Sequence, residues 1–145
     1  MLKPSQRAGI VGVIDPQSAS SAKSTGWIDA SQFHNFLAII MVGALGASGT
    51  VDAKLEQATD NSGTGAKDVT DKAITQLTKA GSDDNKQVEI DLKQEDLDFD
   101  NDFQFFRLTI TPATAASLIA GSVQGFDPRY GAASDNDAAT VDEIV

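Results

Sequence analysis

The sequence contains no cysteine and only one histidine, one tryptophan and one tyrosine. The lack of cysteine excludes disulfide frameworks, thiolate metal sites and cysteine nucleophiles. A metal site built on several histidines is excluded in the same way, and a Ser–His–Asp triad would have to use His34. This histidine opens an apolar run, on the face expected to hold Phe36 and Ile40, so we interpret it as a half-buried structural residue.

Positive charge is also scarce: the chain has 11 Lys and Arg and 21 Asp and Glu, which give a formal net charge of −10. Such a chain repels nucleic-acid phosphate and anionic lipid, so neither a nucleic acid nor a membrane is expected as a partner. The longest apolar stretch, Phe36–Ala47, is shorter than the roughly 20 residues of a membrane-spanning helix. The apolar run after Met1 is too short for a signal peptide, so synthesis in the cytoplasm is expected.

What is present is a chain of 145 residues with 41% hydrophobic and 22% charged residues, typical of one folded soluble domain. Short stretches rich in β-formers recur about every ten residues, separated by Gly, Asp, Asn and Pro. Leu37 and Ile39 fall in a continuous apolar stretch, which predicts a strand covered on both faces. The predicted strands are 9–14 (ended by Asp15-Pro16), 25–29, 33–42, 50–57, 86–92 and 103–111 (ended by Pro112).

Two further segments are less clear. Residues 68–79 suit a helical face or a strand, and we favour a strand after a turn. Residues 115–125 suit a final strand or a small-residue helix. The pattern as a whole predicts an all-β fold, an antiparallel β-sandwich or jelly-roll-like barrel of roughly seven or eight short strands. We expect a single domain over residues 1–130 with a short N-terminal arm, and an acidic tail over 131–145 that is poorly ordered unless a partner holds it.

The acidic run EDLDFDND, which begins at Glu95, places Asp98, Asp100 and Asp102 at alternate positions like the first ligands of an EF-hand. That motif needs Gly at the sixth position and Glu at the twelfth, where this chain has Phe103 and Thr109. An EF-hand is therefore excluded. A looser calcium site in a β-loop stays open, but we favour a charged corner that leads into a core strand and guards it against edge pairing.

No other motif predicts chemistry. The stretch Gly63–Lys67 lacks the spacing of a phosphate-binding loop, so we interpret it as a flexible loop. A glycosidase would need a marked carboxylate pair and aromatic side chains for sugar stacking, and the sequence marks neither. The aromatic residues, including Trp27, Phe105 and Phe106, are expected in the core or an interface. We predict no catalytic residue, no cofactor and no metal ligand.

The order of features resembles a family of small virion proteins of tailed bacteriophages and gene transfer agents. The stretch LEQATDNSGTGAKDV (55–69), the acidic run that continues into FFRLTIT, and DPRY (127–130) bear the resemblance, which spans roughly residues 8 to 130. It implies a structural role in the virion, most simply as a cement or decoration protein that stabilises the head by binding the major capsid protein and other virion subunits. Alternatives are a head-spike base, a neck or tail component, or a carbohydrate-binding jelly-roll module.

The resemblance implies no catalytic residue and leaves the acidic tail unexplained. It places the protein on the capsid surface, where we expect a homo-oligomer. Extended arms bind well to a lattice of capsid subunits, and the arm 1–8 is basic on an otherwise acidic chain. We therefore expect capsid contacts at Lys3, Arg7, Arg129 and Tyr130.

Overall fold

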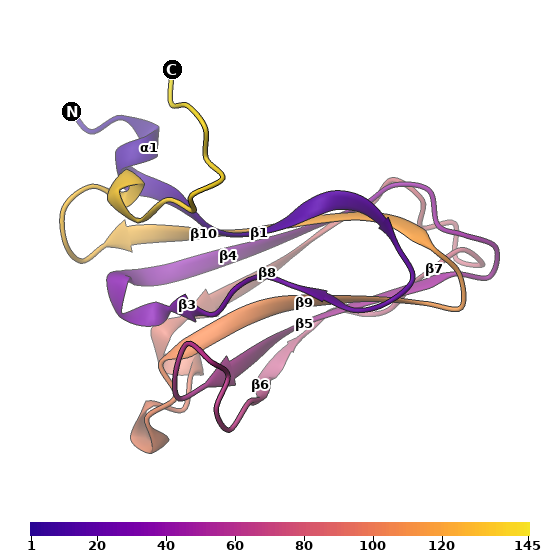
Figure 1. The fold of residues 1–145 in the computed structure, drawn as a ribbon, viewed down its shortest axis with the longest axis horizontal. Coiled ribbons are helices and arrows are strands. Elements are labelled where there is room, and N and C mark those ends of the chain that lie inside the picture. The colour runs from indigo at the N-terminus through magenta and orange to yellow at the C-terminus, as the bar shows by residue number, and fades with distance from the viewer.

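The computed structural model describes residues 1–145 and consists of two antiparallel sheets packed face to face (Figure 1). The strands are β1 (Ala8–Ala19), β2 (Lys23–Ser24), β3 (Ile28–Asp29), β4 (Phe33–Val42), β5 (Thr50–Ala58), β6 (Lys67–Ala73), β7 (Leu77–Thr78), β8 (Gln87–Lys93), β9 (Phe105–Ala113) and β10 (Ser117–Pro128). Helical structure is limited to α1 (Pro4–Arg7) and the 3-10 turns η1 (Ala30–Gln32), η2 (Gln94–Asp96), η3 (Phe99–Asn101) and η4 (Ala133–Asn136). None of these helices is long and apolar enough to cross a membrane.

The strand order defines the fold. Sheet A has the order β1-β10-β4-β8, and sheet B has the order β2-β9-β5-β6, with β3 beside β9 and β7 beside β5. If β2 with β3 and β6 with β7 are taken as interrupted strands, the chain makes two four-stranded sheets in jelly-roll order, as in viral capsid proteins, lectins and cupins. The predicted fold class is therefore confirmed.

The core lies between the two sheets and follows from the alternation of side chains along each strand. On β5, Val51, Ala53 and Leu55 point inward and are buried, as predicted from their spacing. The rings of Phe36 on sheet A and Phe106 on sheet B meet edge to face, with centroids 4.7 Å apart. Burying each such side chain stabilises the fold by about 1.5–3 kcal/mol, so the inner faces hold the sandwich together.

Two prolines expected to end strands lie inside them. β1 continues through Asp15-Pro16 as a bulge, with a register shift between Ile14 and Gln17 opposite β10. Pro112 lies within β9, where β2 covers that strand only as far as Ile110. Because proline lacks an N–H group, it is tolerated in a bulge and on the uncovered side of a strand, and the sequence alone does not reveal which positions those are.

The C-terminal segment packs against the sandwich over part of its length. η4 buries Ala133 beside Gly9, where an added Cβ would lie 2.6 Å from the Ala133 carbonyl oxygen. At the bulge of β1, Ile10 N–H donates to Asp137 Oδ1 (2.8 Å) and Ile10 C=O accepts from Ala138 N–H (2.6 Å). The expectation of a poorly ordered tail is therefore wrong for this stretch, because it bonds backbone groups of an edge strand that β10 does not pair.

Candidate functional site

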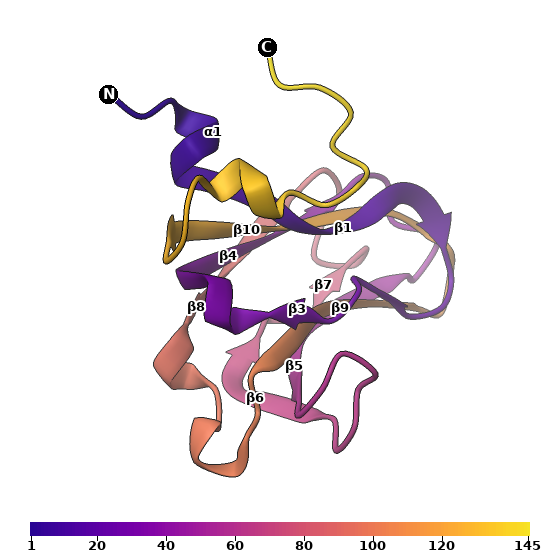
Figure 2. The same cartoon turned by 60° about the vertical axis from the view of Figure 1, so that its left-hand side comes forward.

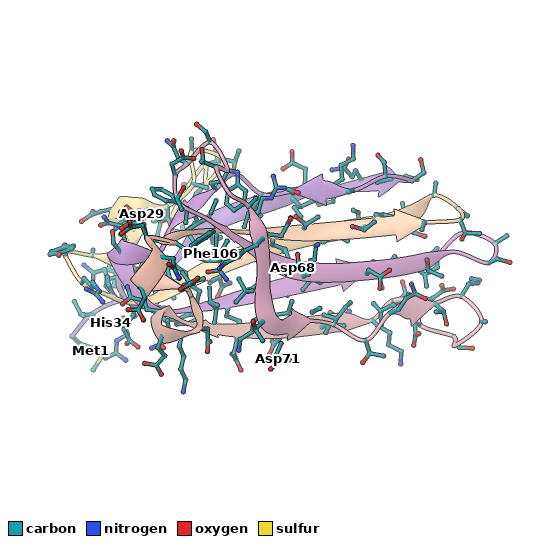
Figure 3. The ribbon with its side chains drawn as sticks, turned by 90° about the horizontal axis from the view of Figure 1, so that it is seen from below. Met1, Asp29, His34, Asp68, Asp71 and Phe106 are labelled. Atoms are coloured by element: carbon teal, nitrogen blue, oxygen red, sulfur yellow. The ribbon has the colours of Figure 1, made fainter.

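His34 is exposed, so its interpretation as a half-buried structural residue is wrong. Phe33 and Phe36 are both buried, and their rings meet edge to face with centroids 5.7 Å apart. Burial of both phenylalanines interrupts the two-residue alternation at the start of β4 and turns His34 outward. Figure 3 shows it near the end of the molecule where Met1 lies.

The run EDLDFDND forms the charged corner that we favoured from the sequence. Asp98 accepts hydrogen bonds from Lys67 Nζ (2.6 Å) and from Asn101, and these bonds lower the pKa of its carboxyl group. Asp102 ends η3 in the left-handed conformation (φ 64°) and redirects the chain toward β9. The structure contains no group of three or more His, Cys, Asp or Glu arranged to hold a metal ion.

The loop around Gly63–Lys67 is closed by a carboxylate of the chain itself. Asp60 Oδ1 accepts from the N–H groups of Ser62 and Thr64 (2.9 and 3.0 Å), and its Oδ2 accepts from the Thr64 hydroxyl. These bonds, that of the Thr64 hydroxyl foremost, lower the pKa of Asp60. The N–H groups that a phosphate loop would offer to a ligand are thus already bound.

The outer face of sheet B is a self-contained polar network. Glu56 on β5 accepts from Arg107 Nε (3.2 Å) and from the Thr109 hydroxyl (2.6 Å) on β9. The Arg107 guanidinium lies over the Trp27 ring, 4.5 Å from its centroid. Gly63 packs against the same indole near its Nε1 atom, since a Cβ added to this glycine would lie 2.8 Å from Nε1. The only tryptophan is therefore packed and does not offer an open stacking platform.

The outer face of sheet A, in contrast, is mostly apolar. Strand pairing sets its outward positions in a grid of four columns, one for each strand. These positions are Ala8, Ile10, Val13, Pro16 and Ser18 on β1; Phe126, Gln124, Ser122, Ala120 and Leu118 on β10; Asn35, Leu37, Ile39 and Met41 on β4; and Lys93, Asp91, Glu89 and Gln87 on β8. The outward side chains of β1, β10 and β4 are mostly apolar, and those of β8 are charged or polar.

Most of this apolar surface is left uncovered by the rest of the chain. Met41 and Leu118 are 50% and 48% exposed, and Leu37 and Ile39 are half-buried. Met41 and Leu118 line a shallow groove of about 420 Å³ that extends to Pro16. The expectation that this strand is covered on both faces is therefore wrong for the isolated chain, because on the outer side of sheet A only α1 approaches, at the Phe126 end of β10.

The four residues expected to contact a capsid lie toward one end of the sandwich. Lys3 and Arg7 belong to the N-terminal segment; Arg7 and Phe126 line a groove between α1 and the end of β10. Arg129 donates to Gln94 Oε1, and Tyr130 is 67% exposed. Both chain ends stand beyond sheet A, on the side away from sheet B (Figures 1 and 2). The residues of the arm could be predicted from the sequence, whereas the sequence did not reveal that the apolar face next to it is uncovered.

Comparison with known proteins gives structural neighbours only. No known protein family matches the sequence, and no curated protein matches it. A structure of tobacco necrosis virus is similar at 12% identity and a TM-score of 0.39, covering 86% of this chain and 95% of that one. A cryo-EM structure of broad bean stain virus is similar at 11% identity and a TM-score of 0.46, covering 92% of each chain. Likeness at this level carries no argument about function, and the fold assignment rests on the strand order described above.

Proposed function

We propose that this chain is a structural protein of a virion, a cement or decoration protein bound to the head of a tailed bacteriophage or gene transfer agent. The observation that carries the proposal is the uncovered apolar outer face of sheet A on a jelly-roll domain. A cement protein binds a preformed lattice through broad, shallow contacts. An uncovered sheet face has that shape, whereas an enzyme site needs a pocket with converging polar groups.

The proposed capsid contact includes the basic end of the molecule. Lys3 and Arg7 are exposed and form no ion pair, and Tyr130 is exposed beside Arg129. On a chain with a net charge of −10, these residues supply the positive charge that an acidic patch on a capsid subunit would attract. The basic arm also gives the attachment a flexible element that orders on binding.

The test uses particles purified by density gradient from cells that carry the gene and from cells in which it is deleted. The protein should be present in the first particles, and purified protein added to the second should bind to saturation. Hundreds of copies per particle support a cement protein; tens indicate a spike base, and six or twelve a neck ring. If the protein is absent from wild-type particles and does not bind the others, the virion role is wrong.

Deletion of residues 1–8 tests the arm separately. The truncated domain should retain its melting temperature, because no residue of α1 is buried, but its occupancy on particles should fall. The matched control is the substitution of Asp142 and Glu143 by Ser, which alters the other chain end without removing positive charge. Full occupancy of the truncated protein would contradict the proposed role of the arm.

A further inference from the structure

We infer that the outer face of sheet A binds the N-terminal segment, Met1–Arg7, of a second copy of this chain. The inference goes beyond the virion role and concerns the purified protein in solution. It rests on a chemical match between two surfaces of the same molecule. Each of them is left without a partner in the single chain.

The first surface combines apolar side chains with an acidic edge. In the β4–β8 pairing, Leu37 is opposite Asp91 and Ile39 is opposite Glu89. Both acidic side chains are exposed, and neither takes part in an ion pair or a side-chain hydrogen bond. A ligand for this surface therefore needs apolar groups flanked by positive charge.

The second surface is the N-terminal segment, which has that composition. Met1 and Leu2 are 118% and 56% exposed, so their apolar side chains contact little of their own domain. Lys3 and Arg7 form no ion pair, whereas most other lysines of the chain do.

The geometry favours a neighbouring copy over the same chain. α1 runs directly into β1 at Ala8, and Figures 1 and 2 show Met1 pointing away from the sandwich. Packing two sheet A faces against each other is disfavoured, because it would bring Glu89 and Asp91 onto apolar or like-charged positions with Lys93 as the only cation of that edge. Seating the segment instead places Lys3 and Arg7 beside that acidic edge.

An interface between a segment on one copy and a face on the next is heterologous, so it forms rings if the rotation closes and chains if it does not. On a particle, copies linked in this way bind with higher avidity than single copies. Loss of the segment would then weaken attachment through the neighbouring copy as well as through direct capsid contact. Measurement without particles separates the two effects.

The experiment is sedimentation velocity of the full-length protein from about 1 to 500 µM at low and high salt. We expect the average mass to rise above the 15.2 kDa of one chain with concentration, and to rise less at high salt because charge pairs are screened. Replacing Lys3 and Arg7 by Glu should weaken association about tenfold or more, and replacing Glu89 and Asp91 by Lys should do the same. Combining all four substitutions in one chain should restore it.

Replacement of Asp52 and Asp100 by Lys is the control for net charge, since it changes the charge by the same amount as the Glu89 and Asp91 pair but lies away from sheet A. It should leave association at least as strong as in the wild type. Thermal melts of every variant verify folding. A wild-type protein that stays monomeric throughout would overturn the inference. So would an oligomer that persists after Lys3→Glu with Arg7→Glu, which would indicate face-to-face packing, and so would failure of the fourfold variant to recover.

Discussion

The outer faces of the two sheets are built on equivalent central strands yet have opposite chemistry. On sheet B, outward Glu56, Arg107 and Thr109 bind one another across β5 and β9. On sheet A, outward Ile39 and Met41 on β4 lie beside the outward side chains of β10 and find no partner in the chain. A sheet face whose side chains satisfy one another is complete in the monomer, whereas an apolar face of this extent marks a binding surface.

The difference also explains how the fold tolerates an apolar outer face. Its side chains pack on their neighbours within the sheet, so Leu37 and Ile39 are half-buried, although the more peripheral Met41 and Leu118 are about half exposed. The inner face of sheet A supplies the folding energy through fully buried residues such as Ile40. The outer face is thus free to serve association while contributing little to folding.

The largest expected effect compares the two sides of β4. Ile40→Ala should lower the free energy of unfolding by about 2–5 kcal/mol, because it leaves a cavity in the core. Leu37→Ala should lower it by about 1 kcal/mol, because that side chain is only half-buried. Denaturant titration measures both. Equal losses at the two positions would mean that another part of the chain covers the outer face.

The next effect tests the network on sheet B. Glu56→Ala removes the acceptor for Arg107 and Thr109, and the Glu56 side chain is only 15% exposed. The expected loss is about 1–3 kcal/mol in the free energy of unfolding, since the Arg107 guanidinium loses its carboxylate partner and the buried Thr109 hydroxyl keeps only its bond with Ser24. Asp52→Ala, at an exposed position on the same strand, is the control and should change stability by less than about 0.5 kcal/mol. A similar loss in both variants would show that the network adds nothing.

On the outer face of sheet A, substitutions should leave stability unchanged but reduce binding of apolar ligands. Met41→Lys combined with Leu118→Lys should change the free energy of unfolding by less than about 0.5 kcal/mol, because both positions are exposed. The double variant should bind less of a hydrophobic dye than the wild type, as measured by fluorescence titration. Unchanged dye binding would indicate that the apolar surface lies elsewhere on the molecule.

The smallest effect concerns pH. Hydrogen bonds from Lys67 and Asn101 lower the pKa of Asp98 from its ordinary value of 3.8. The unfolded chain therefore binds this proton more readily, so the bonds stabilise the fold above pH 3.8 and their contribution is lost as the pH falls through the lowered value. Asp98→Asn should flatten the decline of the melting temperature below that pH. Identical profiles for the two proteins would show that Asp98 is not linked to stability.

Much of the fold could be predicted from the sequence because alternation and turn residues are local signals. The bounds of β4 and the inward face of β5 agree with the prediction, and residues 68–79 contain the strands we favoured there. The predictions were wrong where a segment distant in the sequence determines the local structure. Asp15-Pro16 continues a strand because β10 accepts a bulge there, and residues 133–138 are ordered because Asp137 and Ala138 bond the N–H and C=O groups of Ile10 on the edge strand β1.

The candidate binding surface, too, could be predicted from the sequence only in part. The sequence alone determined that the chain is acidic, lacks cysteine chemistry and carries a basic N-terminal arm. The sequence also marked Phe33–Val42 as apolar on both sides, but a sequence does not reveal whether a second layer covers the outer one. Only the tertiary structure decided this, because burial of a sheet face depends on which elements the connections bring over it, and here the second layer, sheet B, lies on the inner side of sheet A.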